Sequence, residues 1–217
     1  MNIYLYFLLF LIYSFIGWTI EVINVSIIEK RFVNRGFLMG PYCPIYGFGG
    51  ISCYLLLRKY LSDPIALFMM SILIFSILEY MTSYIMEKLF KARWWDYSDK
   101  KFNINGRICL ETMVPFGLLG CFAMYVLNPG LIGILEKIPA NIAMIISIIL
   151  FILFMIDCCI SFKIIINFKN VAFSIKKDST EEITRRVREK LSKESVLTRR
   201  LVNAFSKLQV IKRRKND

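Results

Sequence analysis

Acidic side chains inside apolar segments are the residues of this chain best placed to do chemistry. Four polar residues recur at intervals of three and four: Ser76, Glu79, Ser83 and Glu87. This spacing places them on one face of a helix. An ionised side chain inside a membrane costs on the order of 2.5–3.5 kcal/mol, so it normally faces a cavity and has a partner. Such carboxylates can line a transport pathway or act as general acids and bases.

Other charged residues are expected to join this acidic face. Glu21 lies in the first apolar segment and Glu111 in the fourth. Arg35 and Arg107 are the natural partners, and the four-residue spacing predicts that Arg107 pairs with Glu111 along one helix. The alternative is a structural cluster of ion pairs that stabilises the bundle. Asp157 lies late in the fifth apolar segment.

The segment 34–50 contains five glycines and two prolines in otherwise membrane-like sequence. Pro41 and Pro44 remove backbone donors and disfavour helix at the preceding positions. Lipid tolerates non-helical backbone only where protein covers it or water reaches it. We therefore expect a broken, re-entrant start to the second span that lines a cavity. The alternative is tight helix packing through glycine.

The loop at 93–107 carries Trp94, Trp95 and Tyr97, which suit the aromatic belt of a membrane interface. Its polar residues lie on the same side of the membrane as the segment 34–50, so the two segments can close the acidic cavity together. The candidate cavity and binding residues are Glu21, Asn34, Arg35, Tyr46, Glu79, Asp96, Asn105, Arg107 and Glu111.

These residues need a membrane scaffold to position them. The chain is 57% hydrophobic, whereas roughly 45–50% is usual for soluble domains. The apolar residues come in long runs, and uncharged runs of 18 or more residues are typical of membrane spans. The expected spans lie within residues 3–20, 36–57, 64–90, 108–127 and 140–166. The fold predicted is all-α: a helical membrane bundle of about five transmembrane helices over residues 1–166. The short segment 131–138 is expected to lie at the interface.

Orientation follows from the basic residues. In a five-span arrangement, 25 of the 28 Lys and Arg residues fall on one side. The positive-inside rule then places the N-terminus outside and the tail, residues 167–217, in the cytoplasm of a bacterial plasma membrane. A capping box at 179–182 and an apolar stripe predict an amphipathic helix at about 180–212. This helix is expected to lie on the anionic inner leaflet, or to pair with a partner helix or a second copy of the chain.

Composition excludes several classes of function. The net charge of +12 is explained by topology and by attraction to anionic lipid, so no nucleic acid partner is expected. The chain has no histidine and no CxxC pair, so neither a metal site nor a cofactor is expected. The missing histidine also removes the commonest general base, which leaves proton chemistry to carboxylates.

Several blocks resemble one family. They are residues 13–18 with Glu21, residues 34–47, Glu79-Tyr80, residues 94–98 and residues 103–107. These blocks are similar, in the same order, to the ABC-transporter type IV family of bacterial membrane proteins. The resemblance implies a permease of the plasma membrane. The chain has no Walker-type phosphate loop, so transport by this route needs a separate ATP-binding subunit and a second copy of the chain.

Three functions remain open from the sequence. The first is a permease subunit that uses the broken second span and Glu79 as part of a pathway. The second is a membrane-embedded enzyme that uses carboxylates as acid and base and holds an anionic lipid headgroup with Arg35 and Arg107. The third is a regulatory or structural membrane protein. Whether the chain is an enzyme is therefore not decided by its residues.

Overall fold

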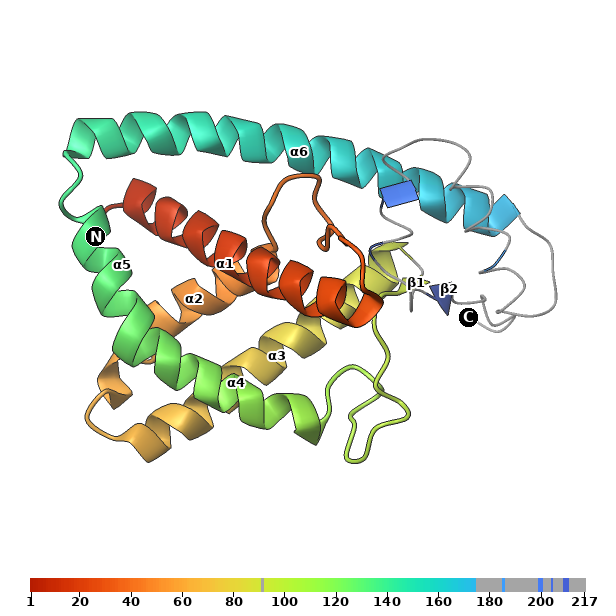
Figure 1. Cartoon of the computed structure of the whole chain (residues 1–217), viewed down its shortest axis with the longest axis horizontal. Helices are drawn as coiled ribbons and strands as arrows, with labels where there is room; N and C mark the ends of the chain where they lie inside the picture. The colour runs from red at the N-terminus through yellow and green to blue at the C-terminus, as the bar shows by residue number, and fades with distance from the viewer. Residues whose placement is uncertain (91, 175–184, 186–198, 201–203, 205–208, 211–217) are drawn as a thin grey trace.

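The computed structural model describes residues 1–90, 92–174, 185, 199–200, 204 and 209–210 (Figure 1). The tail helix predicted at 180–212 lies almost entirely outside the described residues. The elements are α1 (Ile3–Glu29), α2 (Pro44–Leu56), the 3₁₀ turn η1 (Arg58–Tyr60), α3 (Pro64–Phe90), β1 (Ala92–Arg93), α4 (Leu110–Phe122), the π turn η2 (Ala123–Leu127), α5 (Asn128–Leu135), α6 (Ala140–Ser174) and β2 (Gln209–Val210).

Long apolar helices dominate the described part of the chain, as an all-α membrane bundle requires. Four stretches there are long and apolar enough to cross a bilayer: α1, α3, α4 continued through α5, and α6. α2 is shorter, with 13 residues, so it measures about 20 Å at 1.5 Å per residue. The chain is therefore a multi-pass membrane protein.

Successive spans run in alternate directions, with α4 and α5 counted as one span, as Figure 1 shows. One end of the bundle holds the N-terminus, η1 and the α5–α6 connection. The other end holds the α1–α2 and α3–α4 loops, together with β1 and β2, which pair antiparallel. The two polar loops therefore meet at one end, because each follows a helix that runs in the same direction.

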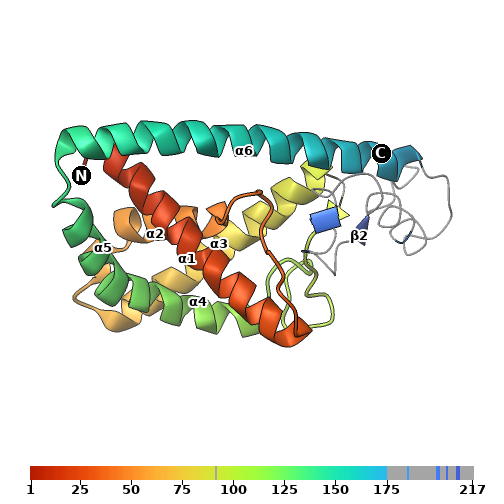
Figure 2. The ribbon, with the colours of Figure 1, turned by 45° about the horizontal axis from the view of Figure 1, so that its top comes forward.

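The bundle consists of two helix pairs and one outer helix. α1 packs against α2 and α3 packs against α4, while α6 contacts α1 and α3. Figure 2 shows α6 lying along one side of the pairs. Only 17% of the apolar window of α6 is buried, and its exposed faces are rich in Ile, Leu and Phe. Such a helix suits a lipid environment, because lipid accepts apolar surface that water rejects.

The fourth span is longer than expected. Residues 131–138 were expected to be a short segment at the interface; the structure shows that most of them belong to α5, which continues α4 into one apolar stretch from 110 to 135. The π turn at Ala123–Leu127 and the position of Pro129 explain the continuity. Pro129 lies in the first turn of α5, where a missing backbone N–H is tolerated.

The glycine- and proline-rich segment divides at Pro44. Residues 30–43 contain no helix, and α2 begins at Pro44. The backbone N–H of Cys43 donates to the Ser14 carbonyl at 2.9 Å. Ser14 lies about 22 Å along α1 from the end of that helix at 1.5 Å per residue. The non-helical segment therefore runs deep beside α1 before the second helix starts.

Glycine supports the second half of this segment by allowing α1 and α2 to approach closely. A Cβ at Gly47 would lie 2.3 Å from the Ser14 hydroxyl oxygen, and one at Gly50 would lie 2.2 Å from the Tyr13 ring. A Cβ at Gly17, on the facing side of α1, would lie 2.1 Å from the Tyr46 ring. These positions accept no larger side chain without a shift of the helices.

Candidate functional site

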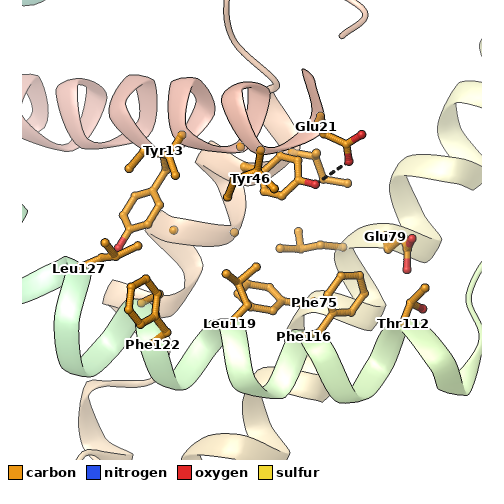
Figure 3. A pocket seen from close by; sticks show the side chains of 18 of the residues that line it. Tyr13, Glu21, Tyr46, Phe75, Glu79, Thr112, Phe116, Leu119, Phe122 and Leu127 are labelled. Carbon is orange, nitrogen blue, oxygen red and sulfur yellow. Dashed lines mark hydrogen bonds between the residues drawn. The ribbon is translucent and has the colours of Figure 1, made fainter. Parts of the chain in front are cut away.

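A cavity of about 380 Å³ lies between the α1/α2 pair and the α3/α4 pair. Figure 3 shows that its charged side chains gather at one end, near the polar loops, while apolar rings fill the other. The polar end is lined by Glu21, Arg35, Tyr46, Glu79, Trp95, Tyr97 and Thr112. Glu21, Arg35, Tyr46 and Glu79 were candidates from the sequence, and the structure brings all four together.

Glu21, near the end of α1, has a partner for each oxygen. Its Oε1 accepts the Tyr46 hydroxyl at 2.7 Å, and its Oε2 accepts the Arg35 Nε at 3.4 Å. Gly17 permits this arrangement, because the Tyr46 ring occupies the space that a side chain at position 17 would need. Arg35 also donates to the Ala204 carbonyl. The Glu21 carboxylate is therefore held and neutralised within the protein.

Glu79, on α3, is only half satisfied. Its Oε1 accepts the Tyr97 hydroxyl at 3.1 Å, while its Oε2 is buried without a hydrogen-bond partner in the described part of the chain. The Thr112 hydroxyl faces the Glu79 carboxyl (Figure 3) and is close enough to share its hydrogen with it, but its better-defined acceptor is the Cys109 carbonyl at 2.8 Å. Burial raises the pKa of the Tyr97 phenol, and the Glu79 carboxylate raises it further, so Tyr97 stays a protonated donor.

The far end of the cavity is apolar. Its wall is formed by aromatic and aliphatic side chains of α3, α4 and η2, among them Phe75, Phe116, Leu119, Phe122 and Leu127. Tyr13 also lies there, and its hydroxyl donates to the buried Asn128 at 2.8 Å. That phenol is thereby satisfied outside the cavity, which leaves its ring as a wall. The cavity is thus polar at one end and apolar along the rest of its length.

Three further candidates, Asn34, Asp96 and Asn105, lie in the loops, where they form hydrogen bonds but do not line the cavity. Asn34 accepts the Trp18 indole N–H at 2.9 Å, and Asn105 donates to the Tyr80 hydroxyl at 2.9 Å. Asp96 accepts the Ser98 hydroxyl at 2.6 Å. Burial opposes ionisation of Asp96, but the hydrogen bonds from Ser98 and the charge of Arg93 outweigh it and hold the pKa of Asp96 below its usual value.

The predicted pair of Arg107 and Glu111 is wrong. Arg107 instead pairs with Glu87 on α3 at 2.7 Å, and Glu111 pairs with Lys100 at 2.9 Å. The physical reason is that α4 begins at Leu110, so Arg107 lies in the loop and the four-residue helical spacing does not apply. The Glu111 side chain is 62% exposed and lies outside the cavity.

Sequence reasoning missed Trp95, Tyr97 and Thr112 as cavity residues. The two aromatic residues were interpreted as part of an interfacial belt, because composition does not show which way a loop side chain turns. The Tyr97 backbone N–H donates to the Gly106 carbonyl at 2.8 Å, and this contact between the two arms of the loop holds Tyr97 in position. No local sequence signal identifies that fold of the loop.

Metal binding finds no support among the described residues, which contain no group of three or more metal-ligating side chains. The cysteines are free thiols, and three of them are buried: Cys43, Cys53 and Cys109. What the cavity offers is hydrogen-bond acceptance at Glu79 and a long apolar wall. This combination suits binding of a molecule with one polar end.

Residues 8–162 match the family described as Putative ABC-transporter type IV. The chain belongs to this family, which confirms the resemblance seen in its motifs. The match spans α1 through most of α6 and therefore includes every helix that lines the cavity. No curated protein and no solved structure matches the chain.

Proposed function

We propose that this chain is a permease-like membrane protein, the membrane subunit of a transporter whose ATPase is a separate chain. The observation that carries the proposal is the cavity between the two helix pairs, with the half-satisfied Glu79 carboxylate at its polar end. An ionisable group in a membrane span is a candidate functional site by default, because burying it is costly. The family supports transport as the process it serves.

The proposed setting is a bacterial plasma membrane, with the N-terminus outside and the tail in the cytoplasm. By sequence, the two polar loops with the adjoining helix ends, together with the tail, hold 25 of the 28 Lys and Arg residues. The positive-inside rule assigns the side that holds them to the cytoplasm. An ATPase would bind the polar loops there. The polar end of the cavity then opens from the cytoplasmic half of the bilayer, and the basic tail meets the anionic leaflet.

The pairing of the arginines weighs against an enzyme that holds an anionic lipid headgroup. Arg35 contacts Glu21 and the Ala204 carbonyl, and Arg107 contacts Glu87. Both guanidinium groups contact protein acceptors that a phosphate would have to displace, although the buried Arg107 Nε has no hydrogen-bond partner in the described part of the chain. A purely structural role for the acidic cluster fits Glu21 well, but it leaves the buried Glu79 oxygen unexplained.

The test is purification of the tagged chain from its native membrane in mild detergent, with mass spectrometry of the proteins that accompany it. A chain with a Walker-type ATP-binding motif in stoichiometric amount is the expected result. The Glu79→Gln variant is expected to retain this partner, because Glu79 lies in the cavity and the polar loops lie at its end. Purification without any ATP-binding chain, in several detergents and after cross-linking in cells, overturns the proposal.

A second copy of the chain is part of the same proposal, since transport by this route needs a complete pathway. Mass measurement of the purified complex in native membrane nanodiscs reports the number of copies directly. Two copies with two ATP-binding chains is the expected composition. A complex with one copy of this chain and one ATP-binding chain would overturn the proposed dimer and leave the proposed ATPase partner standing.

A further inference from the structure

We propose that the cavity binds a single-chain amphipathic cation, in chemical class an alkylammonium. This inference deepens the proposed function, on which it rests, by naming the substrate class of the same cavity. The ammonium head lies against Glu79, and the apolar chain runs along α4 toward Leu127. Charge, hydrogen bonding and shape each support this assignment.

The charges at the polar end do not balance. Among the described residues that line the cavity, there are two carboxylates, Glu21 and Glu79, and one guanidinium, Arg35. Glu21 holds that guanidinium, with 3.4 Å between the Arg35 Nε and the Glu21 Oε2. In the described part of the chain, Glu79 is left with neutral hydroxyl groups, those of Tyr97 and Thr112. A buried carboxylate without a cationic partner is strongly unfavourable, so a cationic ligand stabilises it.

Hydrogen bonding defines the place of the head. Glu79 is 9% exposed, and its Oε2 has no partner in the described part of the chain. An alkylammonium carries three N–H donors and can reach this oxygen, whereas a carboxylate or phosphate head brings only acceptors. An anionic head would also face repulsion from Glu79, which a medium of low dielectric constant strengthens.

Aromatic rings surround the same end. Tyr46, Trp95 and Tyr97 line the cavity beside Glu79. The faces of such rings attract cations, with the strongest effect where water is excluded. The ring composition therefore favours the same sign of charge as the unpaired carboxylate does.

Shape limits the length of the ligand. The cavity is polar only at the Glu79 end and continues past Phe116 and Leu119 to Leu127 (Figure 3). A volume of about 380 Å³, at about 30 Å³ for each water-sized unit, holds on the order of a dozen non-hydrogen atoms. That is the size of decylamine and far too small for both chains of a phospholipid. The cavity therefore accommodates a single apolar chain of about this length.

The test is calorimetric titration of the purified chain in phosphatidylcholine nanodiscs, with empty nanodiscs subtracted. The probes are decylamine, decanol and decanoate, which differ only in the head. Decylamine is expected to bind at least tenfold more tightly than either of the others. Decanoate binding as tightly as decylamine overturns the proposal.

Two variants assign the effect to the cavity. Glu79→Gln is expected to reduce decylamine affinity to that of decanol, while Glu111→Gln, an exposed carboxylate outside the cavity, leaves it unchanged. Should Glu79→Gln fail to fold, Leu119→Trp keeps the proposal falsifiable. It fills the apolar end and is expected to weaken decylamine at least tenfold but to spare hexylamine. If both variants still bind decylamine more tightly than decanol, the ligand binds outside this cavity and the proposal is wrong.

This titration involves no ATPase, so it is independent of the test of the transporter. Binding of decylamine by a chain that purifies without any ATP-binding subunit overturns the proposed transporter and leaves the ligand class standing. If an ATPase partner is found but decylamine, decanol and decanoate bind equally well, the proposed transporter stands and the proposed ligand class is wrong.

Discussion

The Asp157 carboxylate on α6 accepts the backbone N–H of Gly40 at 2.7 Å, across 117 residues of sequence. The same carboxylate accepts the Met39 N–H at 2.9 Å, the Tyr42 hydroxyl at 2.6 Å and the Ser161 hydroxyl at 2.9 Å. The outer helix thereby supplies the hydrogen bonds that the non-helical start of the second span cannot make within itself. This explains how irregular backbone is accommodated deep in a membrane bundle.

The first prediction concerns Asp157. Asp157→Ala leaves two backbone donors and the Tyr42 hydroxyl without this acceptor, and each unsatisfied buried group costs about 1–3 kcal/mol. The free energy of unfolding is expected to fall by about 3 kcal/mol or more, which thermal unfolding in detergent detects as a lower midpoint. Ser161→Ala, which removes one donor to Asp157, is the matched control. Equal midpoints for the two variants would contradict the role of Asp157.

The second prediction concerns the contact between α1 and α2. Gly17→Ala places a Cβ 2.1 Å from the Tyr46 ring, and overpacking of this kind typically costs about 1–3 kcal/mol. Thermal unfolding in detergent should show a clear loss of stability. Gly133→Ala, where nothing lies within 4 Å of the added Cβ, is the control and is expected to be neutral or slightly stabilising. A stable Gly17→Ala protein would mean that α1 and α2 lie farther apart.

The third prediction separates the two candidate partners of Arg107. A double-mutant cycle of Arg107→Met with Glu87→Gln is expected to give a coupling energy of about 1 kcal/mol or more. The parallel cycle with Glu111→Gln should give less than about 0.5 kcal/mol, as for residues that do not interact. Unfolding free energies of the single and double variants provide both values. Larger coupling to Glu111 would restore the pairing expected from sequence spacing.

The fourth prediction tests orientation. Lys59→Cys and Lys101→Cys place exposed thiols at opposite ends of the bundle. A membrane-impermeant maleimide is expected to label Lys59→Cys in intact cells and Lys101→Cys only after permeabilisation. The unmodified chain is the control and measures the background, because Cys159 is exposed and Cys121 and Cys158 are only partly buried. The opposite labelling pattern would invert the proposed topology and place the polar end of the cavity outside the cell.

Local sequence features predicted much of the scaffold. Long apolar runs predicted the all-α membrane bundle, because hydropathy and helical period depend on neighbouring residues alone. The same period placed Glu79 on the polar face of α3, and the glycines and prolines of residues 34–50 indicated that the second span would not be a plain helix. The fourth span was expected to end at residue 127, but the π turn at Ala123–Leu127 lets it continue through α5.

Tertiary structure alone decided which charges meet. The sequence allowed Arg107 to reach Glu111 along one helix, but the path of the loop brings it to Glu87. It offered no sign that Asp157 holds residues 39–42 or that Tyr97 turns inward to Glu79. Hydropathy acts on each segment separately, whereas these contacts depend on how loops fold and how separate helices pack. The sequence therefore determined that carboxylates lie within the apolar spans, and the packing determined that Glu79 is buried without a cationic partner in the described part of the chain.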